Sequence, residues 1–503
     1  MAATIIDSGV CGENIEWELN GNGLLNITGT GSMTDYSWSN LPPWDNVKDN
    51  IKKVKIVSGV TSIGDFSFYR CNNLTAITIP NSTQSIGESA FANSGLTKVT
   101  IPDSVQSIGK AAFQSSKLTG VTIPSSVTSI GQGAFESSRL SSVTIKNSVI
   151  EEYQFYGCSK LTKVTIPRSV TTIGEGAFEN SGLTKVTIPR SVTTIGKSAF
   201  ENSGLTSVTI ENDIIGENQF YSCSGLTKVT IPSSVTSIGQ SAFESSGLTK
   251  VKIENGVTDI EENAFHSCSG LTSVTIPGSV QSIGDYAFAS SGLTSVTIED
   301  GVNFIGENAF HSCSGLINVK IPGSVDSIGD YAFANSGLTS VTIENGVTSI
   351  GENAFISCSG LIDVTIPGSV ASIGQGAFES NGLTSLTIED GVTVIGKNAF
   401  KFCSELTDLI IPGSVTNIGQ SAFESSGLTS VTVKDGVNSI GIGANAFKSC
   451  WRLTKIRLRK DSIIDPIAFA GCSLVFVFAP SGGRAEETCK AATNSMFVKE
   501  NSQ

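Results

Sequence analysis

Histidines are the first residues to examine for chemistry, because an imidazole can bind metals and transfer protons near neutral pH. The chain has two, His266 and His311, each in the string A-F-H-S-C-S-G and 45 residues apart. That separation is two repeat coils, or roughly 10 Å at the usual strand spacing. Ligands of one metal lie only about 2 Å from it. Each histidine has a cysteine two residues later, so at most a two-ligand site is available. We therefore predict structural histidines and no metal.

Cysteines are the next candidates, and nine of the eleven follow a recurring phenylalanine by three residues. From Cys223 to Cys403 they recur two coils apart, whereas a disulfide needs Cα atoms within about 7 Å. Cys450 and Cys472 stand on adjacent coils and are the one pair that could reach. We interpret the set as small buried hydrophobic side chains. The nine are Cys71, Cys158, Cys223, Cys268, Cys313, Cys358, Cys403, Cys450 and Cys472.

Carboxylates do not form an acid/base pair in this pattern. Glu136, Glu179, Glu201 and Glu244 each follow a phenylalanine, which is typical of a solvated face. No nucleophile motif, phosphate-binding loop, dinucleotide fingerprint or metalloprotease motif is present. We predict that the protein is not an enzyme and uses no cofactor.

Basic side chains are the more informative set. In the recurring stretch L-x-x-V-x-I, the third and fifth positions point outward if the stretch is a strand. Threonine dominates the fifth position, and lysine recurs at the third position in the first half of the chain. We predict a ligand-binding strand face made of Lys163, Thr165, Arg168, Lys185, Thr187, Arg190, Thr209, Lys228, Thr230, Lys250 and Lys252.

Two other interpretations of this surface stay open. Threonine is a good exposed strand residue, and lysine prevents aggregation of exposed strands, so the stripe also fits a surface with no ligand. A regular threonine ladder is also typical of ice binding, but the interspersed lysines and an expected curvature disfavour a flat ice-matching plane.

The net charge of -13 over 503 residues disfavours nucleic acid and anionic membranes as partners. A basic stripe on such a chain predicts an anionic partner, either a glycan or an acidic protein surface. No apolar run is long enough to span a bilayer, and no signal peptide or anchor is visible. The oligomeric state is not encoded in any pattern that we recognise.

The residues discussed above recur at fixed intervals, so a repeat in the sequence must position them. Aligning the chain on one phenylalanine reveals nineteen coils, from Phe68 to Phe469, mostly 22 or 23 residues apart. A typical unit is LTSVTIPGSVQSIGDYAFASSG, residues 271–292. Valine and isoleucine of L-x-x-V-x-I face inward, proline ends the strand, S-V-x-x-I forms the next side, and glycine allows the corner turn. Stacking should bury each phenylalanine ring on its neighbours.

Two coils are shorter than the rest. Phe155 and Phe220 follow the preceding phenylalanine by only 20 residues, because K-N-S-V-I-E-E and E-N-D-I-I-G-E omit two residues before the corner. We predict local kinks at these two places.

The repeat resembles the BspA-like, Treponema-type leucine-rich repeat family, which has this L-x-x-V-x-I-P-x-S-V-x-x-I-G-x-x-A-F coil. The resemblance implies a curved leucine-rich-repeat solenoid, mostly β with short helical or 3-10 turns. It also implies an N-terminal cap at residues 1–50, a solenoid at 51–473, and a C-terminal strand and short helical cap at 474–503. The strand L-V-F-V-F-A-P and the helix-like R-A-E-E-T-C-K-A-A carry the second cap.

As function, the resemblance implies a cell-surface or secreted protein that binds host, matrix or microbial ligands. The alternative is an intracellular or architectural scaffold, with which the many unpaired cysteines are consistent.

Overall fold

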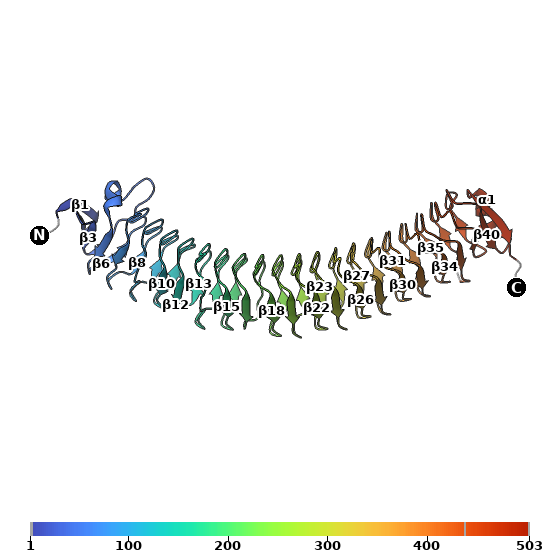
Figure 1. Ribbon diagram of the computed structural model, residues 1–503, viewed down its shortest axis with the longest axis horizontal. Helices are drawn as coiled ribbons and strands as arrows, with labels where there is room; N and C mark the ends of the chain where they lie inside the picture. The colour runs from blue at the N-terminus through green and yellow to red at the C-terminus, as the bar shows by residue number, and fades with distance from the viewer. Residues whose placement is uncertain (1–3, 437–438, 501–503) are drawn as a thin grey trace. The chain divides into compact units, whose positions relative to one another are not determined.

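A computed structural model describes residues 4–436 and 439–500 of the chain (Figure 1). The chain divides into two compact units, Met1–Val235 with Ala242–Leu248, and Thr236–Ser241 with Thr249–Gln503. Within each unit successive coils stack side by side, and most coils contribute two β-strands and a return segment of turns. This is the predicted leucine-rich-repeat solenoid, and its described residues contain one α-helix and one 3-10 helix.

The first strand of most coils comes from the L-x-x-V-x-I stretch, and we call the outward surface of these strands the strand face. Neighbouring strands are parallel and in matching register, so that Thr122 lies beside Thr144. Their bounds are β5 Lys53–Ile56, β7 Ala76–Thr78, β10 Gly120–Ile123, β12 Ser142–Ile145, β15 Lys185–Ile188, β17 Ser207–Ile210, β18 Lys228–Ile231, β20 Lys250–Ile253, β22 Ser273–Ile276, β24 Ser295–Ile298, β26 Asn318–Ile321, β28 Ser340–Ile343, β30 Asp363–Ile366, β32 Ser385–Ile388, β34 Asp408–Ile411, β36 Ser430–Val433 and β38 Lys455–Arg457.

The second strand of a coil is short and ends at the isoleucine before the corner glycine. In the second unit these strands form one parallel sheet from β19 to β39. Their bounds along the chain are β4 Gly31–Ser32, β6 Val60–Ile63, β8 Ser85–Ile86, β9 Ser107–Ile108, β11 Ser129–Ile130, β13 Val149–Ile150, β14 Thr172–Ile173, β16 Thr194–Ile195, β19 Ser237–Ile238, β21 Asp259–Ile260, β23 Ser282–Ile283, β25 Phe304–Ile305, β27 Ser327–Ile328, β29 Ser349–Ile350, β31 Ser372–Ile373, β33 Val394–Ile395, β35 Asn417–Ile418, β37 Gly441–Ile442 and β39 Ile463–Ile464.

The two ends of the described chain extend the first row of strands. At the start, β1 (Ile5–Gly12) pairs antiparallel with β2 (Ile15–Asn20), which pairs antiparallel with β3 (Leu24–Gly29), and β3 pairs in parallel with β5. The 3-10 helix η1 spans Asp45–Asn50. At the other end, the predicted strand and helix are present. Their bounds are β40 Val475–Ala479 and α1 Arg484–Ala491, followed by β41 Ser495–Lys499. The division of the chain at residues 50 and 474 stays a prediction.

Phenylalanine rings fill the interior of both units, as the repeat predicts. From Phe68 to Phe243 in the first unit, consecutive rings stack with centroids 5.2 to 5.8 Å apart. From Phe265 to Phe469 in the second unit, the distances are 5.1 to 5.8 Å. Trp44 stacks on Phe68 at 5.5 Å and so covers the first ring of the column. Stacking of coils therefore buries rings that a single coil would leave in water.

The corner glycine has a different role from the one that we predicted. Gly109, at one such corner, lies outside the left-handed region, so its φ and ψ do not require glycine. A Cβ added there would lie 2.5 Å from the backbone nitrogen of Glu88 and from the carbonyl carbon of Gly87. The interpretation as a special backbone turn is therefore wrong, and the glycine is needed because successive coils approach too closely for a side chain.

Substituting Gly109 by alanine is expected to lower the free energy of unfolding by about 1–3 kcal/mol, the usual cost of overpacking. Gly216 provides a matched control at the same corner of a shortened coil. Its added Cβ would meet nothing closer than 3.5 Å, and the equivalent corner of the other shortened coil carries Glu151. Urea denaturation should thus separate Gly109→Ala from Gly216→Ala, and equal losses would contradict the close-approach explanation.

In every coil from Phe68 to Phe447 the return segment is shaped by two left-handed residues, one placed two residues before the phenylalanine and one placed two residues after it. Around Phe178 these are Gly176 and Asn180, with φ of 55° and 56°. The backbone N–H of Phe178 donates to Ala199 O at 2.8 Å, and that of Asn180 donates to Glu201 O at 2.9 Å, both in the next coil. Bonds between coils thus continue through the return segment as well as through the strands.

The two shortened coils interrupt the second row of strands, which stops after β11 and after β16. The first row stops after β12 and β17 but also after β7, β20 and β32, so its breaks do not single out the shortened coils. The kinks stay a prediction. Ring centroids are 5.8 Å apart at Phe135–Phe155 and 5.7 Å apart at Phe200–Phe220. Between the other consecutive phenylalanine rings of the first unit, the centroid distance is 5.2 or 5.3 Å.

Buried amides hold the shortened coils together in place of the missing residues. In the second of them, Asn212 Nδ2 donates to Ile214 O at 2.9 Å, and Gln219 Oε1 accepts from the backbone N–H of Gly216 at 2.7 Å. Gln219 is fully buried and replaces the alanine that precedes phenylalanine in most coils. Hydrogen bonding of backbone groups by these amides allows a coil to close with two residues fewer.

Candidate ligand-binding groove

Two neighbouring strands of the first unit, β15 and β17, present the central residues of the predicted surface. Lys185 pairs with Ser207 and Thr187 pairs with Thr209 in parallel register. Val186, between the two outward residues of β15, is buried, whereas Lys185 and Thr187 are exposed. Period-2 alternation therefore directs the cationic and hydroxyl groups to the solvent, as the sequence predicts.

The coil before β15 carries Lys163 and Thr165 but forms no regular strand. Its only ladder contact among the described residues is an isolated bridge between Lys163 and Lys185. The strand predicted for L-T-K-V-T-I, residues 161–166, is therefore wrong. Residues 96–101, in a coil that does not follow a shortened one, likewise form only an isolated bridge, between Ala76 and Lys98. Lys163 and Thr165 are nevertheless exposed at the expected register.

A groove of about 710 Å³ lies over this part of the strand face. Of the eleven predicted site residues it brings six together, with Glu211 as the one carboxylate in its lining. The six are Lys163, Thr165, Arg168, Lys185, Thr187 and Thr209.

A notch of about 820 Å³ adjoins the groove and shares Arg168 and Glu211 with it. Arg190, Ser191 and Pro232 line its other walls. We attribute the notch to the second shortened coil. This coil lacks two residues between the P-R-S segment at 189–191 and the P-S-S segment at 232–234, and the space between these segments stays open. Sequence reasoning identified the short coil but missed that its missing residues open a hollow beside two arginines.

The remaining predicted residues lie apart from the groove. Lys228 and Thr230, on β18, are exposed and line neither hollow. Lys250 and Lys252, on β20, belong to the second unit and line a separate hollow of about 480 Å³. Lys252 Nζ also lies 2.7 Å from a carboxylate oxygen of Glu254, so its charge already has a local partner.

The cations of the groove and notch have no such partner. Within residues 4–436 and 439–500, Lys163, Lys185, Arg168 and Arg190 form no ion pair, and all four side chains are exposed. Four positive charges face one carboxylate, that of Glu211, across the two hollows. The local field is therefore positive on a chain whose net charge is -13.

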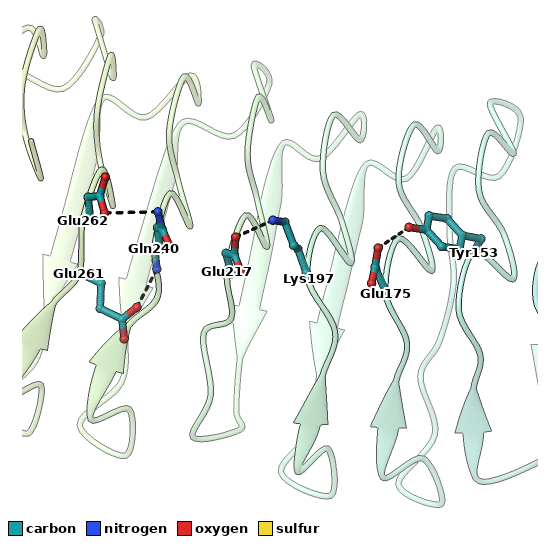
Figure 2. Close-up of polar contacts among 7 residues, drawn as sticks. All are labelled: Tyr153, Glu175, Lys197, Glu217, Gln240, Glu261 and Glu262. Carbon is teal, nitrogen blue, oxygen red and sulfur yellow. Dashed lines mark hydrogen bonds and ion pairs between the residues drawn. The ribbon is translucent and has the colours of Figure 1, made fainter.

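Some return segments pair their charges and polar groups (Figure 2). Lys197 Nζ lies 2.6 Å from Glu217 Oε1, and this bond raises the pKa of Lys197. The Tyr153 hydroxyl donates to the Glu175 carboxylate, which raises the pKa of Tyr153 to about 12. In the second unit, the Gln240 backbone N–H donates to the carboxylate of Glu261 at 2.9 Å. Other cations of the return segments, such as Lys110 and Lys160, also form no ion pair within residues 4–436 and 439–500. The groove and notch are therefore distinguished by the gathering of four cations around one carboxylate.

Cysteines lie in the interior, as predicted. Cys158 and Cys223 are buried, and each thiol donates to the carbonyl of the phenylalanine in the preceding coil at 3.2 Å. Cys450 and Cys472, the one pair placed within possible reach, remain separate thiols. They donate instead to carbonyl oxygens of Phe423 and Phe447 at 3.0 and 2.9 Å.

The part of the chain that the structure describes brings no three His, Cys, Asp or Glu side chains together as metal ligands. His311 Nε2 lies 3.2 Å from Asn335 Nδ2, and burial lowers the pKa of this histidine. No helix among the described residues is long and apolar enough to cross a bilayer.

Comparison with known families gives matches along most of the chain. The profile of the BspA type leucine-rich repeat region matches residues 46–151, 148–272, 243–361, 326–442 and 440–488. A comparison with curated proteins gave no match.

Solved structures of bacterial leucine-rich repeat proteins are similar to the chain. A leucine-rich repeat protein from Eubacterium ventriosum is 26% identical, with 75% of this chain and 95% of that chain covered and a TM-score of 0.37. One from Bacteroides ovatus is 21% identical, with 97% and 99% covered and a TM-score of 0.41. A leucine-rich cell surface protein from Faecalibacterium prausnitzii is 21% identical, with 98% and 100% covered and a TM-score of 0.31.

Proposed function

Since the chain belongs to the BspA-type leucine-rich repeat family, we propose that it is a non-catalytic binding module whose strand-face groove holds an anionic group of its partner. Leucine-rich repeat families are typically protein-interaction modules and are generally not catalytic. The partner is a protein or a glycan on a host cell, in a matrix or on another microbe.

The observation that carries this proposal is the set of unpaired cations in the groove and notch. A protein with a net charge of -13 repels polyanions on average, so a polyanion can bind it only where positive charge is concentrated. Arg168 and Arg190 offer planar guanidinium groups, which bind carboxylate, sulfate or phosphate with two hydrogen bonds at once. Thr187 and Thr209 add hydroxyl groups beside them.

Charge reversal tests the proposal, with heparin as a soluble polyanionic probe. The triple substitution Lys163→Glu, Arg168→Glu and Lys185→Glu, at three cations that line the groove, is expected to weaken heparin binding by about tenfold at physiological salt. Each exposed contact is worth about 0.5 kcal/mol, so three of them are worth about 1.5 kcal/mol, which corresponds to about a factor of ten. Surface plasmon resonance at several salt concentrations measures the loss, which should shrink as salt screens the charges.

A matched triple substitution separates the groove from net charge. Lys55, Lys98 and Lys455 are exposed on the same strand face and form no ion pair within residues 4–436 and 439–500, and reversing them changes the total charge equally. Retained binding in this control, together with loss in the groove variant, supports the proposal. Equal weakening in both variants, or no binding by the wild-type protein, would overturn it.

We further propose that the protein acts at the cell surface or after secretion, and its family membership supports this placement. Labelling intact cells with a membrane-impermeant reagent tests the placement directly. A protein labelled only after lysis would favour the scaffold alternative.

A further inference from the structure

Another hollow, formed by return segments of the first unit, has aromatic walls. Its volume is about 380 Å³, and Trp38, Phe66 and Tyr69 form one end while Tyr153 forms the other. Trp38 is 64% exposed, although tryptophan is usually well buried. The hollow is lined by none of the predicted strand-face residues.

The two ends are separated by small side chains at one register of the repeat. Phe66 and Tyr153 each lie two residues before one of the stacked, buried phenylalanines, Phe68 and Phe155. The three coils between them carry Ser89, Ala111 and Gly133 at this position. Large rings therefore bound a floor three coils wide, and the ends lie roughly 20 Å apart at the usual strand spacing.

The rings at the first end are fixed by contacts with one another. The Trp38 ring lies edge to face with Tyr69 at 4.8 Å and with Phe66 at 5.6 Å. The guanidinium group of Arg70 lies 5.1 Å from the Tyr69 ring and 5.8 Å from the Trp38 ring. The loop that carries Trp38 is closed by backbone bonds in both directions between Ser37 and Asn40.

The ring at the other end is equally well positioned. The Tyr153 hydroxyl donates to Glu175, as Figure 2 shows. Its ring lies against Gly176, where an added Cβ would be only 2.5 Å from the tyrosine Cε1. Both walls are thus rigid before any ligand binds, which reduces the entropic cost of binding.

Polar side chains between the walls have unused hydrogen-bonding capacity. The side chains of Gln114, Gln132 and Glu136 line the hollow and make no hydrogen bond within residues 4–436 and 439–500. Two amides offer both donors and acceptors, and the carboxylate offers acceptors. Exposed aromatic faces next to uncommitted amides suit a ligand that has apolar faces and hydroxyl edges.

The charges around this hollow show no positive excess. Glu88 and Glu136 in the lining and Glu175 beside Tyr153 supply three negative charges, and Lys110 in the lining and Arg70 beside the tryptophan supply two positive charges. A neutral ligand therefore fits this hollow better than the polyanion proposed for the strand face.

From this arrangement we infer that the aromatic-walled hollow is a second binding site, and that it takes a neutral oligosaccharide. A pyranose ring has C–H groups on its faces, which pack on an aromatic face, and hydroxyls at its edge, which bond to amides and carboxylates. An extended chain of sugars would contact Trp38 at one end, the amides of the floor in the middle, and Tyr153 at the other end.

Native affinity electrophoresis in gels containing mannan, xylan or laminarin, a β-1,3-glucan, tests the inference. At least one of these neutral polysaccharides should retard the wild-type protein. Trp38→Ala and Tyr153→Ala should each weaken that retardation about tenfold, whereas Trp38→Phe, which keeps an aromatic face, should retain most of it.

Trp451 provides the matched control. It is 63% exposed and has the Arg452 guanidinium 4.5 Å from its ring, but it lies outside the hollow. Trp451→Ala and the groove triple variant should both bind polysaccharide normally, so failure here and failure of the strand-face proposal are distinguishable. Absence of retardation by all three polysaccharides, or equal loss in Trp38→Ala and Trp451→Ala, would overturn the inference.

Discussion

Replacing Phe178 by alanine is expected to lower the free energy of unfolding by about 3–5 kcal/mol. The Phe178 ring is fully buried and stacks on Phe155 and on Phe200, each at a centroid distance of 5.3 Å. Removing it leaves a cavity between two rings that cannot close together, because each coil is tied to the next through strands and return segments. Urea denaturation followed by far-UV circular dichroism measures the loss.

Phe402→Ala is the matched control for this experiment. Phe402 is 47% exposed and lies outside the ring column, so its removal should cost less than about 1 kcal/mol. Because each coil contacts only its neighbours, Phe178→Ala should destabilise the first unit before the second, and a second transition in the urea curve would report this. A loss no larger than that of Phe402→Ala would contradict the role assigned to the ring column.

The ring column is the part of the fold that the sequence predicts best. Each phenylalanine occupies the same place in its coil, so nineteen copies of one pattern specify one packing solution. The same logic explains why the buried position of the cysteines could be predicted. A residue that recurs three positions after a buried phenylalanine must share its interior environment in every coil.

Features that depend on neighbouring coils were harder to predict. The corner glycine at Gly109 is required by the backbone of the coil beneath it, and no single coil contains that information. The strand expected at residues 161–166 is absent, although the same letters L-T-K-V-T-I at residues 183–188 contain β15. Each pattern was recognised correctly in its own coil, and the error arose from stacking.

The candidate sites follow the same division. The outward direction of Lys185 and Thr187 follows from period-2 alternation and was predicted. The notch beside Arg168 and Arg190 arises where two residues are missing, and a residue alignment shows the deletion without showing the space. The aromatic-walled hollow joins Trp38 to Tyr153 across more than a hundred residues. The one local signal for it is a large ring at a register that elsewhere in that stretch holds Ser89, Ala111 or Gly133.

Alkaline pH is expected to destabilise the protein steeply through its buried thiols. Burial raises the pKa of Cys158 and of Cys223 from 9.0 to about 11. Below pH 9 both thiols are protonated in the folded and unfolded states, so neither makes stability depend on pH. Between pH 9 and pH 11 the unfolded chain loses these protons and the folded chain keeps them, so stability falls as pH rises. The loss reaches about 2 kcal/mol for each thiol at pH 11.

The double substitution Cys158→Ser and Cys223→Ser isolates this effect from the titration of lysine and tyrosine, which both proteins share. Serine already occupies the equivalent position in neighbouring coils, as at Ser138 and Ser203, so the substitution introduces a side chain that the repeat tolerates. Urea denaturation at pH 8, 9, 10 and 11 should show the wild-type protein losing stability faster than the variant above pH 9. A difference between the two proteins that stays constant from pH 8 to pH 11 would mean that the thiols ionise as readily in the folded chain as in the unfolded one. The thiols of Cys158 and Cys223, which donate to the carbonyls of Phe135 and Phe200, would then have to be accessible to water. This would contradict their burial in the interior.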